Sequence, residues 1–338
     1  MVVTFGEIMM RLAPPQHLLI GQTKNLEMTF GGGEANVAVS LSVLGNKAKF
    51  VTKLPDNDIG KACAGELQRY GVDTSDIRYG GSRIGIYFCE KGASQRPSKV
   101  IYDRANSAIA ETQPDDFDWN AVFNGAKWFH FTGITPALSD SSATVTLEAC
   151  KAAKKLGVTV SCDLNYRKKL WSKDKAQKVM TGLMEYVDVL IANEEDAADV
   201  FGIHAKDTDI TAGSIDRDGY TSVAQQLTQR FGFKKTAITL RESVSASENN
   251  WSALLYSGNE INFSKKYNIK IIDRVGSGDS FAAGLIYGLT NNFDDMKSLE
   301  FAVAASCLKH SIEGDFNLAT VNDVNSLLAG DGSGRVQR

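Results

Sequence analysis

Between residues 126 and 240, short apolar runs alternate with segments in which apolar residues recur at helical spacing. Such runs are typical of buried strands, and the segments between them are typical of amphipathic helices. This alternation predicts an α/β fold with a mostly parallel sheet covered by helices on both faces. The expected strands lie at 126–134, 158–164, 188–193 and 235–240, and the expected helices at 141–157, 174–187, 194–202 and 220–232.

Two segments break this alternation. Residues 8–30 and 82–105 alternate apolar and polar positions without a helical segment inside them, which predicts antiparallel strands in a small separate sheet. Each flanks a helical segment, so we expect this sheet to be inserted into the α/β domain. A hairpin is expected at 252–264, with its turn at Ser257-Gly258-Asn259.

The arrangement of these segments along the chain indicates a single domain. We expect residues 1–328 to form a single α/β domain that carries the inserted strands. The polar segment 205–219 is expected to be a mobile loop, and residues 329–338 a disordered tail. The exposed edges of the inserted strands could pair between two copies of the chain, so a homodimer or higher homo-oligomer is plausible.

The composition narrows the functional class. The chain has 338 residues, of which 43% are hydrophobic and 23% charged, with a net charge of −3. This balance is ordinary for a globular protein and gives no sign of a nucleic-acid or membrane-binding surface. No apolar run approaches the roughly 20 residues that span a bilayer. The N-terminus has no basic region or cleavage site of a signal peptide.

The cysteines and histidines show no metal-binding pattern. The cysteines are odd in number, widely spaced and without a C-x-x-C pair, so neither a disulfide framework nor a zinc site is expected. A reducing cytoplasm is the expected location. The histidines show no ligand spacing, and nothing supports a histidine-based triad. The five cysteines are Cys63, Cys89, Cys150, Cys162 and Cys307.

The segment IIDRVGSGDSFAAG, residues 271–284, carries the strongest chemical signal. A helix N-terminus presents unpaired N–H groups and a partial positive charge of about half a unit, and glycines let an anion approach it closely. Gly276, Ser277 and Gly278 could therefore hold a phosphoryl group. Asp279 would lie beside it and accept a proton from a hydroxyl. We expect the helix end to favour the ionised form of Asp279.

Two other interpretations of this segment are open at this point. Asp279 could simply cap the helix, with the glycines forming a tight turn. A dinucleotide-binding turn would need a small residue at position 281, which is Phe281. The phosphate-binding pattern G-x-x-x-x-G-K-[ST] is absent from the sequence.

A second segment, FGGGEANVAVSLSVLG at 30–45, also places glycines before a helix. Together the two segments resemble the ribokinase-like family of carbohydrate kinases, with its signatures G-G-x-x-x-N-x-A and D-[TS]-x-G-A-G-D. Here these span Gly32 to Ala38 and Asp273 to Asp279, with Arg274 where most members have a small residue. The resemblance covers residues 1–328 and implies ATP and Mg²⁺ as cofactors and a lid formed by the inserted strands.

The resemblance also implies roles for individual residues. Asp279 corresponds to the catalytic base, and Gly276-Ser277-Gly278 to the anion hole. Residues 193–196 resemble the N-x-x-E element that orders Mg²⁺ through water, with Asp196 in place of Glu, so that either Asp196 or Glu195 could serve. A charged first helical turn would explain the same acids. The implied nucleotide or cofactor contacts are Asn165, Asn193, Thr239, Arg241, Ser243, Gly276 and Gly278.

Three arginines indicate whether the sugar substrate is neutral or acidic. Kinases of neutral sugars in this family carry an Asp where this chain has Arg11. Arg104 and Arg167 would suit a carboxylate, since a guanidinium matches it bidentately, although either alone would be better explained as a solvated charge. With Arg11, their positions resemble the 2-keto-3-deoxygluconate kinase branch. The implied substrate contacts are Gly33, Asn36, Tyr87, Tyr102, Arg104, Arg167, Asp279 and Asp315.

The expected function is therefore Mg-ATP-dependent phosphorylation of 2-keto-3-deoxygluconate at its terminal hydroxyl. A fructokinase-like enzyme on the same fold is the nearest alternative. A non-catalytic sugar-acid sensor is a more distant one, and a dehydrogenase would have to bind a nicotinamide.

Overall fold

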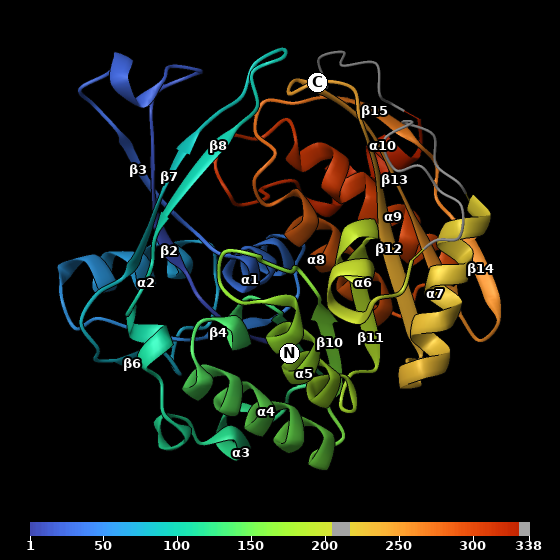
Figure 1. Ribbon diagram of the computed structural model, residues 1–338, viewed down its shortest axis with the longest axis horizontal. Helices are drawn as coiled ribbons and strands as arrows, with labels where there is room; N and C mark the ends of the chain where they lie inside the picture. The colour runs from blue at the N-terminus through green and yellow to red at the C-terminus, as the bar shows by residue number, and fades with distance from the viewer. Residues whose placement is uncertain (205–216, 331–338) are drawn as a thin grey trace.

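The computed structural model describes residues 1–204 and 217–330. Most of the loop predicted at 205–219 and most of the tail predicted at 329–338 lie outside the described residues. Figure 1 shows the described elements as a broad sheet with helices on both sides and a narrow group of strands that projects away from it.

The main sheet has nine strands in the described part of the chain. They are β1 (Val2–Phe5), β4 (Ala48–Val51), β9 (Trp128–Thr132), β10 (Thr159–Asp163), β11 (Val189–Asn193), β12 (Lys235–Ser243), β13 (Glu248–Ser257), β14 (Glu260–Phe263) and β15 (Tyr267–Lys270). Their order is β14-β13-β12-β11-β10-β9-β1-β4, with β15 paired to β13. The adjacent strands β4, β1, β9, β10, β11 and β12 pair in parallel. In contrast, β13 pairs antiparallel with β12, β14 and β15.

Helices cover both faces of this sheet. One core contains α1 (Gly33–Val43), α2 (Asp58–Arg69), α8 (Ser277–Thr290), α9 (Asp295–Lys309) and α10 (Val321–Leu328). The other contains α3 (Trp119–Val122), α4 (Asp140–Lys155), α5 (Lys173–Met184), α6 (Glu194–Phe201) and α7 (Arg217–Phe231). Alternate strand residues enter opposite cores: Val2 packs in the first, and Val3 and Phe5 in the second. The parallel strands are mostly apolar, as expected for strands with both faces buried, and include a few buried polar residues such as Thr4 and His130.

The predicted elements between residues 126 and 240 are confirmed. The expected strands correspond to β9, β10, β11 and β12, and the expected helices to α4, α5, α6 and α7. The hairpin predicted at 252–264 is β13 and β14, with Gly258 and Asn259 at its turn in positive-φ conformations. The shorter elements are β5 (Lys53–Leu54), β6 (Arg78–Tyr79), η1 (Ile20–Gln22), η2 (Ala108–Glu111), η3 (Pro114–Asp116) and η4 (Thr135–Ala137).

The inserted segments form a separate four-stranded sheet, the lid, in the order β3-β2-β7-β8. Its strands are β2 (Met9–Ala13), β3 (Glu27–Gly31), β7 (Gly85–Glu90) and β8 (Lys99–Asp103). The prediction of an antiparallel sheet was wrong at its centre, because β2 and β7 pair in parallel. Each segment is an antiparallel hairpin, but the hairpins join through their first strands, which both lead away from the main sheet (Figure 1).

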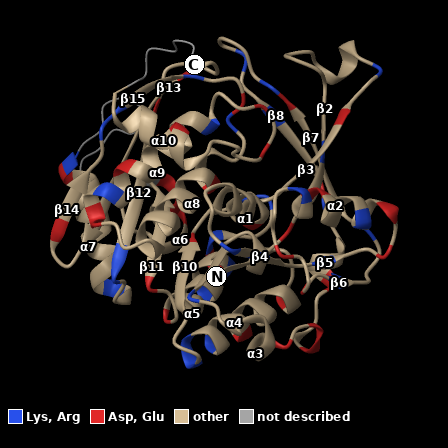
Figure 2. Cartoon of the chain, turned by 180° about the vertical axis from the view of Figure 1, so that it is seen from behind, with Lys and Arg blue, Asp and Glu red and all other residues tan. Residues whose placement is uncertain are grey.

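The surface charge is mixed, as the small net charge leads one to expect. Figure 2 shows Lys and Arg positions interspersed with Asp and Glu over the described elements. Across residues 1–204 and 217–330, every helix is too short or too polar to cross a bilayer. The five cysteines are free thiols.

Candidate active site

The site is built around the start of α8. Gly276, its N-cap, has a φ of 82°, a left-handed conformation that favours glycine. A Cβ at Gly276 would lie 2.0 Å from the carbonyl oxygen of Asp315, so this close approach also requires glycine. Ser277, Gly278 and Asp279 form the first turn of the helix. Their backbone N–H groups have no partners within the helix. The N–H of Ser277 donates a hydrogen bond of 3.3 Å to the Arg274 carbonyl oxygen, and those of Gly278 and Asp279 can face an anion.

The start of α1 meets the start of α8. The Nδ2 atom of Asn36 donates a hydrogen bond of 2.7 Å to Oδ2 of Asp279. Gly33 begins α1, and a Cβ there would lie 3.6 Å from Oδ1 of Asp279. The two glycine-rich segments that the sequence singled out are therefore in direct contact.

A buried carboxylate holds α1 in this place. Glu34 is 1% exposed, and its Oε1 atom accepts hydrogen bonds from the Thr132 N–H, the Thr132 hydroxyl and the Thr135 hydroxyl, at 2.7–2.9 Å. Burial raises the pKa of Glu34, and the two threonine hydroxyls partly offset that rise. The end of β9 and the start of α1 thus form one rigid wall behind Gly33.

The ionisation of Asp279 differs from the prediction. The pKa of Asp279 is raised from 3.8 to about 7. Burial is the largest cause, the charges of Glu34 and Asp315 add to the rise, and the Asn36 hydrogen bond and Arg167 partly offset it. The expectation that the helix end would hold the carboxylate ionised was wrong, because desolvation outweighs the helix-end effect. A carboxylate with a pKa near neutrality is well suited to general base catalysis.

A cleft of about 1360 Å³ opens above Asp279 between the lid and the carboxyl ends of the parallel strands. This volume exceeds that of a typical small-molecule pocket and leaves room for two substrates. Ser243, at the end of β12, does not line the cleft, although it lies in the described part of the chain. The predicted site residues that line it are Gly33, Asn36, Tyr87, Tyr102, Arg104, Asn165, Arg167, Asn193, Glu195, Asp196, Thr239, Arg241, Gly276, Ser277, Gly278, Asp279 and Asp315.

Arg104 and Arg167 approach the cleft from opposite sides. Arg104 follows β8 of the lid, is 8% exposed, forms an ion pair with Glu7 and lies over the Tyr102 ring at 5.2 Å. Its buried Nε atom has no hydrogen-bond partner among the described residues. Arg167 follows β10 and, within the described residues, its side chain donates only to the neighbouring Tyr166 carbonyl oxygen, at 3.1 Å. Both guanidinium groups therefore keep N–H donors without a partner among the described residues.

Arg11 lies elsewhere. It is 2% exposed, does not line the cleft, and forms ion pairs of 2.6 Å with Asp273 and 2.8 Å with Asp315. The hypothesis that counted Arg11 with Arg104 and Arg167 as support for an acidic substrate is wrong to that extent, because two carboxylates of the protein already occupy its guanidinium group. Although burial lowers it, these carboxylates raise the pKa of Arg11 overall.

A second group of carboxylates lies at the ends of β10 and β11. Asn193 caps α6 by accepting from the N–H groups of Glu195 and Asp196 at 2.9 Å. Asp196 is 4% exposed and accepts from the Tyr166 N–H at 3.0 Å, while Glu195 is exposed. Burial raises the pKa of Asp196 to about 6, and it raises the pKa of Asp163, which also lines the cleft.

These side chains could bind Mg²⁺ as part of a ligand set that waters and substrate phosphates complete. Within the described residues, no group of three or more His, Cys, Asp or Glu side chains could hold a metal ion by itself. Mg²⁺ in phosphoryl-transfer sites is usually held by one or two carboxylates together with waters and substrate phosphates. Asp163, Asn193 and Asp196, at the cleft wall, supply such oxygens.

The family assignment follows from sequence comparison. The family model for pfkB family carbohydrate kinases matches residues 1–317. This chain belongs to that family. Its members are phosphotransferases that use an alcohol group as acceptor, so this protein is a carbohydrate kinase.

Relatives of this PfkB kinase act on, or are named for, several sugars. A 2-dehydro-3-deoxygluconokinase from Thermotoga maritima is 53% identical in sequence, with a TM-score of 0.94 over 97% of this chain and 98% of that one. A 2-dehydro-3-deoxygalactonokinase from Haloferax volcanii is 33% identical over 98% of both chains. A candidate ribokinase II from E. coli, crystallised with ATP and Mg²⁺, is 18% identical with a TM-score of 0.79 over 97% of this chain and 98% of that one, and shows a shared fold.

Three residues of the PfkB site were given no role of their own in the sequence analysis. Glu7 orients Arg104, Asp163 lines the cleft at the end of β10, and Asp273 accepts a hydrogen bond from the Val275 N–H before the anion hole. Asp163 had a usable signal, since ligands bind at the carboxyl ends of parallel strands and it ends a predicted strand. The contact of Glu7 with Arg104, 97 positions away in the chain, could not be predicted, because only the fold brings the two together.

Proposed function

We propose that this PfkB kinase transfers the γ-phosphoryl group of ATP to the terminal hydroxyl of 2-keto-3-deoxygluconate. The observation that carries the proposal is that Arg104 and Arg167 line the same cleft as Asp279. A sugar acid that places its carboxylate against these guanidinium groups gains an ion pair and bidentate hydrogen bonds, which a neutral sugar without a carboxylate cannot form. The 53% identity to a 2-dehydro-3-deoxygluconokinase supports the same choice.

The proposed reaction uses Asp279 as the general base. As the sugar hydroxyl oxygen bonds to the γ-phosphorus, its proton passes to the Asp279 carboxylate. The bond between the γ-phosphorus and the bridging oxygen of ATP breaks, and ADP leaves. The N–H groups at the start of α8, at Gly276, Ser277 and Gly278, would stabilise the negative charge on the phosphoryl oxygens during transfer.

The other predicted residues would serve the nucleotide and its metal. Mg²⁺, when bound, would neutralise phosphate charge. We propose that Asn193 and Asp196 orient its water ligands, rather than Glu195, because Asp196 is fixed in place and Glu195 is exposed. Asn165, Thr239 and Arg241 would contact the nucleotide. Ser243 lies outside the cleft lining, and its predicted contact has the least support.

The proposal is tested by comparing substrates. ADP release would be measured with 2-keto-3-deoxygluconate, 2-keto-3-deoxygalactonate, fructose and ribose, each at several concentrations. We expect the highest kcat/KM with the gluconate. A higher value with the galactonate would favour the activity named for the Haloferax relative. A higher value with fructose or ribose would contradict the acidic substrate and favour the fructokinase-like alternative.

A binding protein without catalysis is the remaining alternative. It would bind the sugar acid in a titration calorimeter yet release no ADP in the presence of Mg-ATP. The position of Asp279 at the start of α8, with a pKa near 7, favours catalysis. Turnover that survives Asp279→Asn would instead contradict the proposed mechanism.

The lid also bears on assembly. We infer that residues 1–328 form a single kinase domain and that the protein acts in the cytoplasm. We also infer that two copies of the chain associate through their lids. The edge strands β3 and β8 expose Met28 and Ile101, at 54% and 43%. Unpaired strand edges with exposed apolar side chains favour pairing with a second copy. Light scattering on the wild type and on Ile101→Lys tests this, and a monomeric wild type would contradict it.

A further inference from the structure

A buried ionic cluster connects the lid to the loop that precedes the proposed anion hole. Arg11 lies on the lid strand β2, and its guanidinium donates 2.6 Å to Asp273 and 2.8 Å to Asp315. These acids are 262 and 304 positions away in the sequence. The two acids are 3% and 4% exposed. One arginine thus joins three separate parts of the chain.

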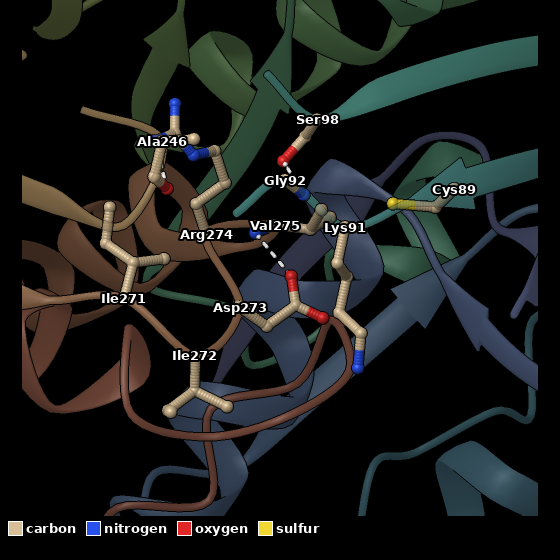
Figure 3. A pocket seen from close by; sticks show the side chains of 10 residues that line it. All are labelled: Cys89, Lys91, Gly92, Ser98, Ala246, Ile271, Ile272, Asp273, Arg274 and Val275. Carbon is tan, nitrogen blue, oxygen red and sulfur yellow. Dashed lines mark hydrogen bonds between the residues drawn. The ribbon is translucent and has the colours of Figure 1, made fainter. Parts of the chain in front are cut away.

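Asp273 fixes the backbone at the entrance to the anion hole. Its Oδ1 atom accepts from the Val275 N–H at 3.1 Å, and its Oδ2 atom from the Gly314 N–H at 3.2 Å. Figure 3 shows the first of these bonds from Asp273 to the residue just before Gly276. The carboxylate that Arg11 holds therefore sets the position of the segment from which Gly276 turns into α8.

Asp315 fixes the same loop from the lid side. The hydroxyl of Tyr87, on the lid strand β7, donates to its carboxylate at 2.6 Å. A Cβ at Gly31, on β3, would lie 2.1 Å from Asp315 Oδ2, and a Cβ at Gly276 would lie 2.0 Å from its carbonyl oxygen. Asp315 is thus packed between three lid strands, through Arg11, Tyr87 and Gly31, and the anion-hole loop.

A second buried cation, Lys309, lies near this cluster. Lys309 is fully buried, and its ammonium group donates 2.9 Å to the carbonyl oxygen of Ile312. Burial lowers the pKa of Lys309 to about 8, and the charges of Asp273 and Asp315 partly offset that decrease. Because removing one member of a buried ion pair leaves its partner uncompensated, a change at Arg11 should disturb both Asp273 and Asp315.

We propose that Arg11 is a positioning residue that couples sugar binding under the lid to the geometry of the anion hole. The inference rests on the proposed function, because it takes residues 276–278 as the phosphate-binding loop. When sugar fixes the lid and Tyr87, the cluster holds Asp315 and Asp273, and the loop is set for the nucleotide. By thermodynamic linkage, sugar should then tighten nucleotide binding, and the nucleotide should tighten sugar binding equally.

The test is the ratio of two dissociation constants. The Kd of Mg-AMP-PNP would be measured by calorimetry without sugar and with saturating sugar, using the sugar that the wild type phosphorylates fastest. We expect sugar to tighten binding roughly fivefold or more in the wild type. In Arg11→Lys, which keeps the charge but loses the fork, we expect the ratio to fall to within about twofold of unity and kcat to fall roughly tenfold or more.

Lys49→Met is the control, since Lys49 forms a partly buried ion pair with Asp76 at 2.5 Å and lies outside the cleft lining. It should keep the wild-type ratio, which does not depend on the fraction of folded protein. If Arg11→Lys does not fold, Asp273→Asn replaces it, and the same loss of coupling is expected. A wild-type ratio near one, or an unchanged ratio in the folded variant, overturns the inference. Failure of the proposed function is a separate result, seen as turnover that persists in Asp279→Asn.

Discussion

The amide nitrogen of Asn36 lies 2.7 Å from the carboxylate of Asp279, although 243 positions separate them in the chain. Each residue is in the first turn of its own helix, α1 or α8, and each helix begins after a glycine. The contact brings the segment proposed to bind sugar against the one proposed to bind phosphate. The predictions below follow from this contact and from its surroundings.

Replacing Asp279 with Asn should lower kcat roughly 10²–10⁴-fold, the usual contribution of a general base. The side chain keeps its shape and can still accept from Asn36, so the KM for either substrate should change little. Steady-state kinetics with purified protein measures both effects. An unchanged kcat would remove Asp279 from the mechanism.

The same variant should be more stable than the wild type at alkaline pH. The pKa of Asp279 rises on folding from 3.8 to about 7, so the folded state binds more protons than the unfolded state between these values. Stability therefore decreases as pH rises through this window, and Asn, which is uncharged, escapes the loss. We expect a higher Tm than wild type at pH 8 and a smaller difference at pH 4. Equal differences at the two pH values would contradict the raised pKa.

The activity of the wild type should fall on the acid side of neutrality. A base acts in its ionised form, and Asp279 becomes protonated as pH falls through about 7. The profile of kcat/KM against pH should therefore show an acid limb with an apparent pKa near 7, below which the rate falls about tenfold per pH unit. A profile that stays flat down to pH 5 would exclude Asp279 as the titrating base.

Replacing Asn36 with Ala should move this acid limb upward. The Asn36 hydrogen bond lowers the pKa of Asp279, so its loss leaves burial and the neighbouring acids less opposed. Turnover should fall more at pH 6 than at pH 9, when compared with the wild type. A uniform loss at all pH values would show that Asn36 acts only by contacting sugar.

Replacing Arg104 with Ala should raise the KM for the sugar acid roughly 10- to 100-fold, the effect of losing a hydrogen bond to a charged group. The KM for fructose should be far less affected. Arg83→Ala is the matched control, because Arg83 pairs with Asp103 on the same lid hairpin at 2.7 Å but does not line the cleft. Equal effects on the acidic and neutral sugars would argue against a carboxylate contact.

Two glycines of the anion hole should differ in what they tolerate. Gly276→Ala forces a left-handed φ of 82° on an alanine, which costs about 1–2 kcal/mol, and drives its Cβ into the Asp315 carbonyl. We expect a lower Tm together with lost turnover. At Gly278 an added Cβ meets no atom within 4 Å, so Gly278→Ala should fold normally and lose only turnover. Thermal denaturation separates the two, and equal Tm values would contradict the close approach at Gly276.

The sequence by itself determined the alternation of strands and helices, the two glycine-rich segments at which helices begin, and the identity of the residues around Asp279. Strand and helix periodicity are local properties, and a glycine at a helix start follows from local backbone geometry. This explains why β9 to β12 and their helices could be predicted, and why Asp279 could be selected among many acids. The arginine pair, Arg104 and Arg167, was found by its resemblance to a sugar-acid kinase branch.

Only the tertiary structure decided which charges meet. Arg11 was grouped with the substrate arginines, but the fold buries it between Asp273 and Asp315. The fold also pairs β2 with β7 in parallel, where an antiparallel sheet was predicted. The pKa of Asp279 depends on desolvation and on Glu34 and Asp315, which lie far away in the sequence. Electrostatic energies depend on distance and burial, and neither is encoded in the spacing of residues along a chain.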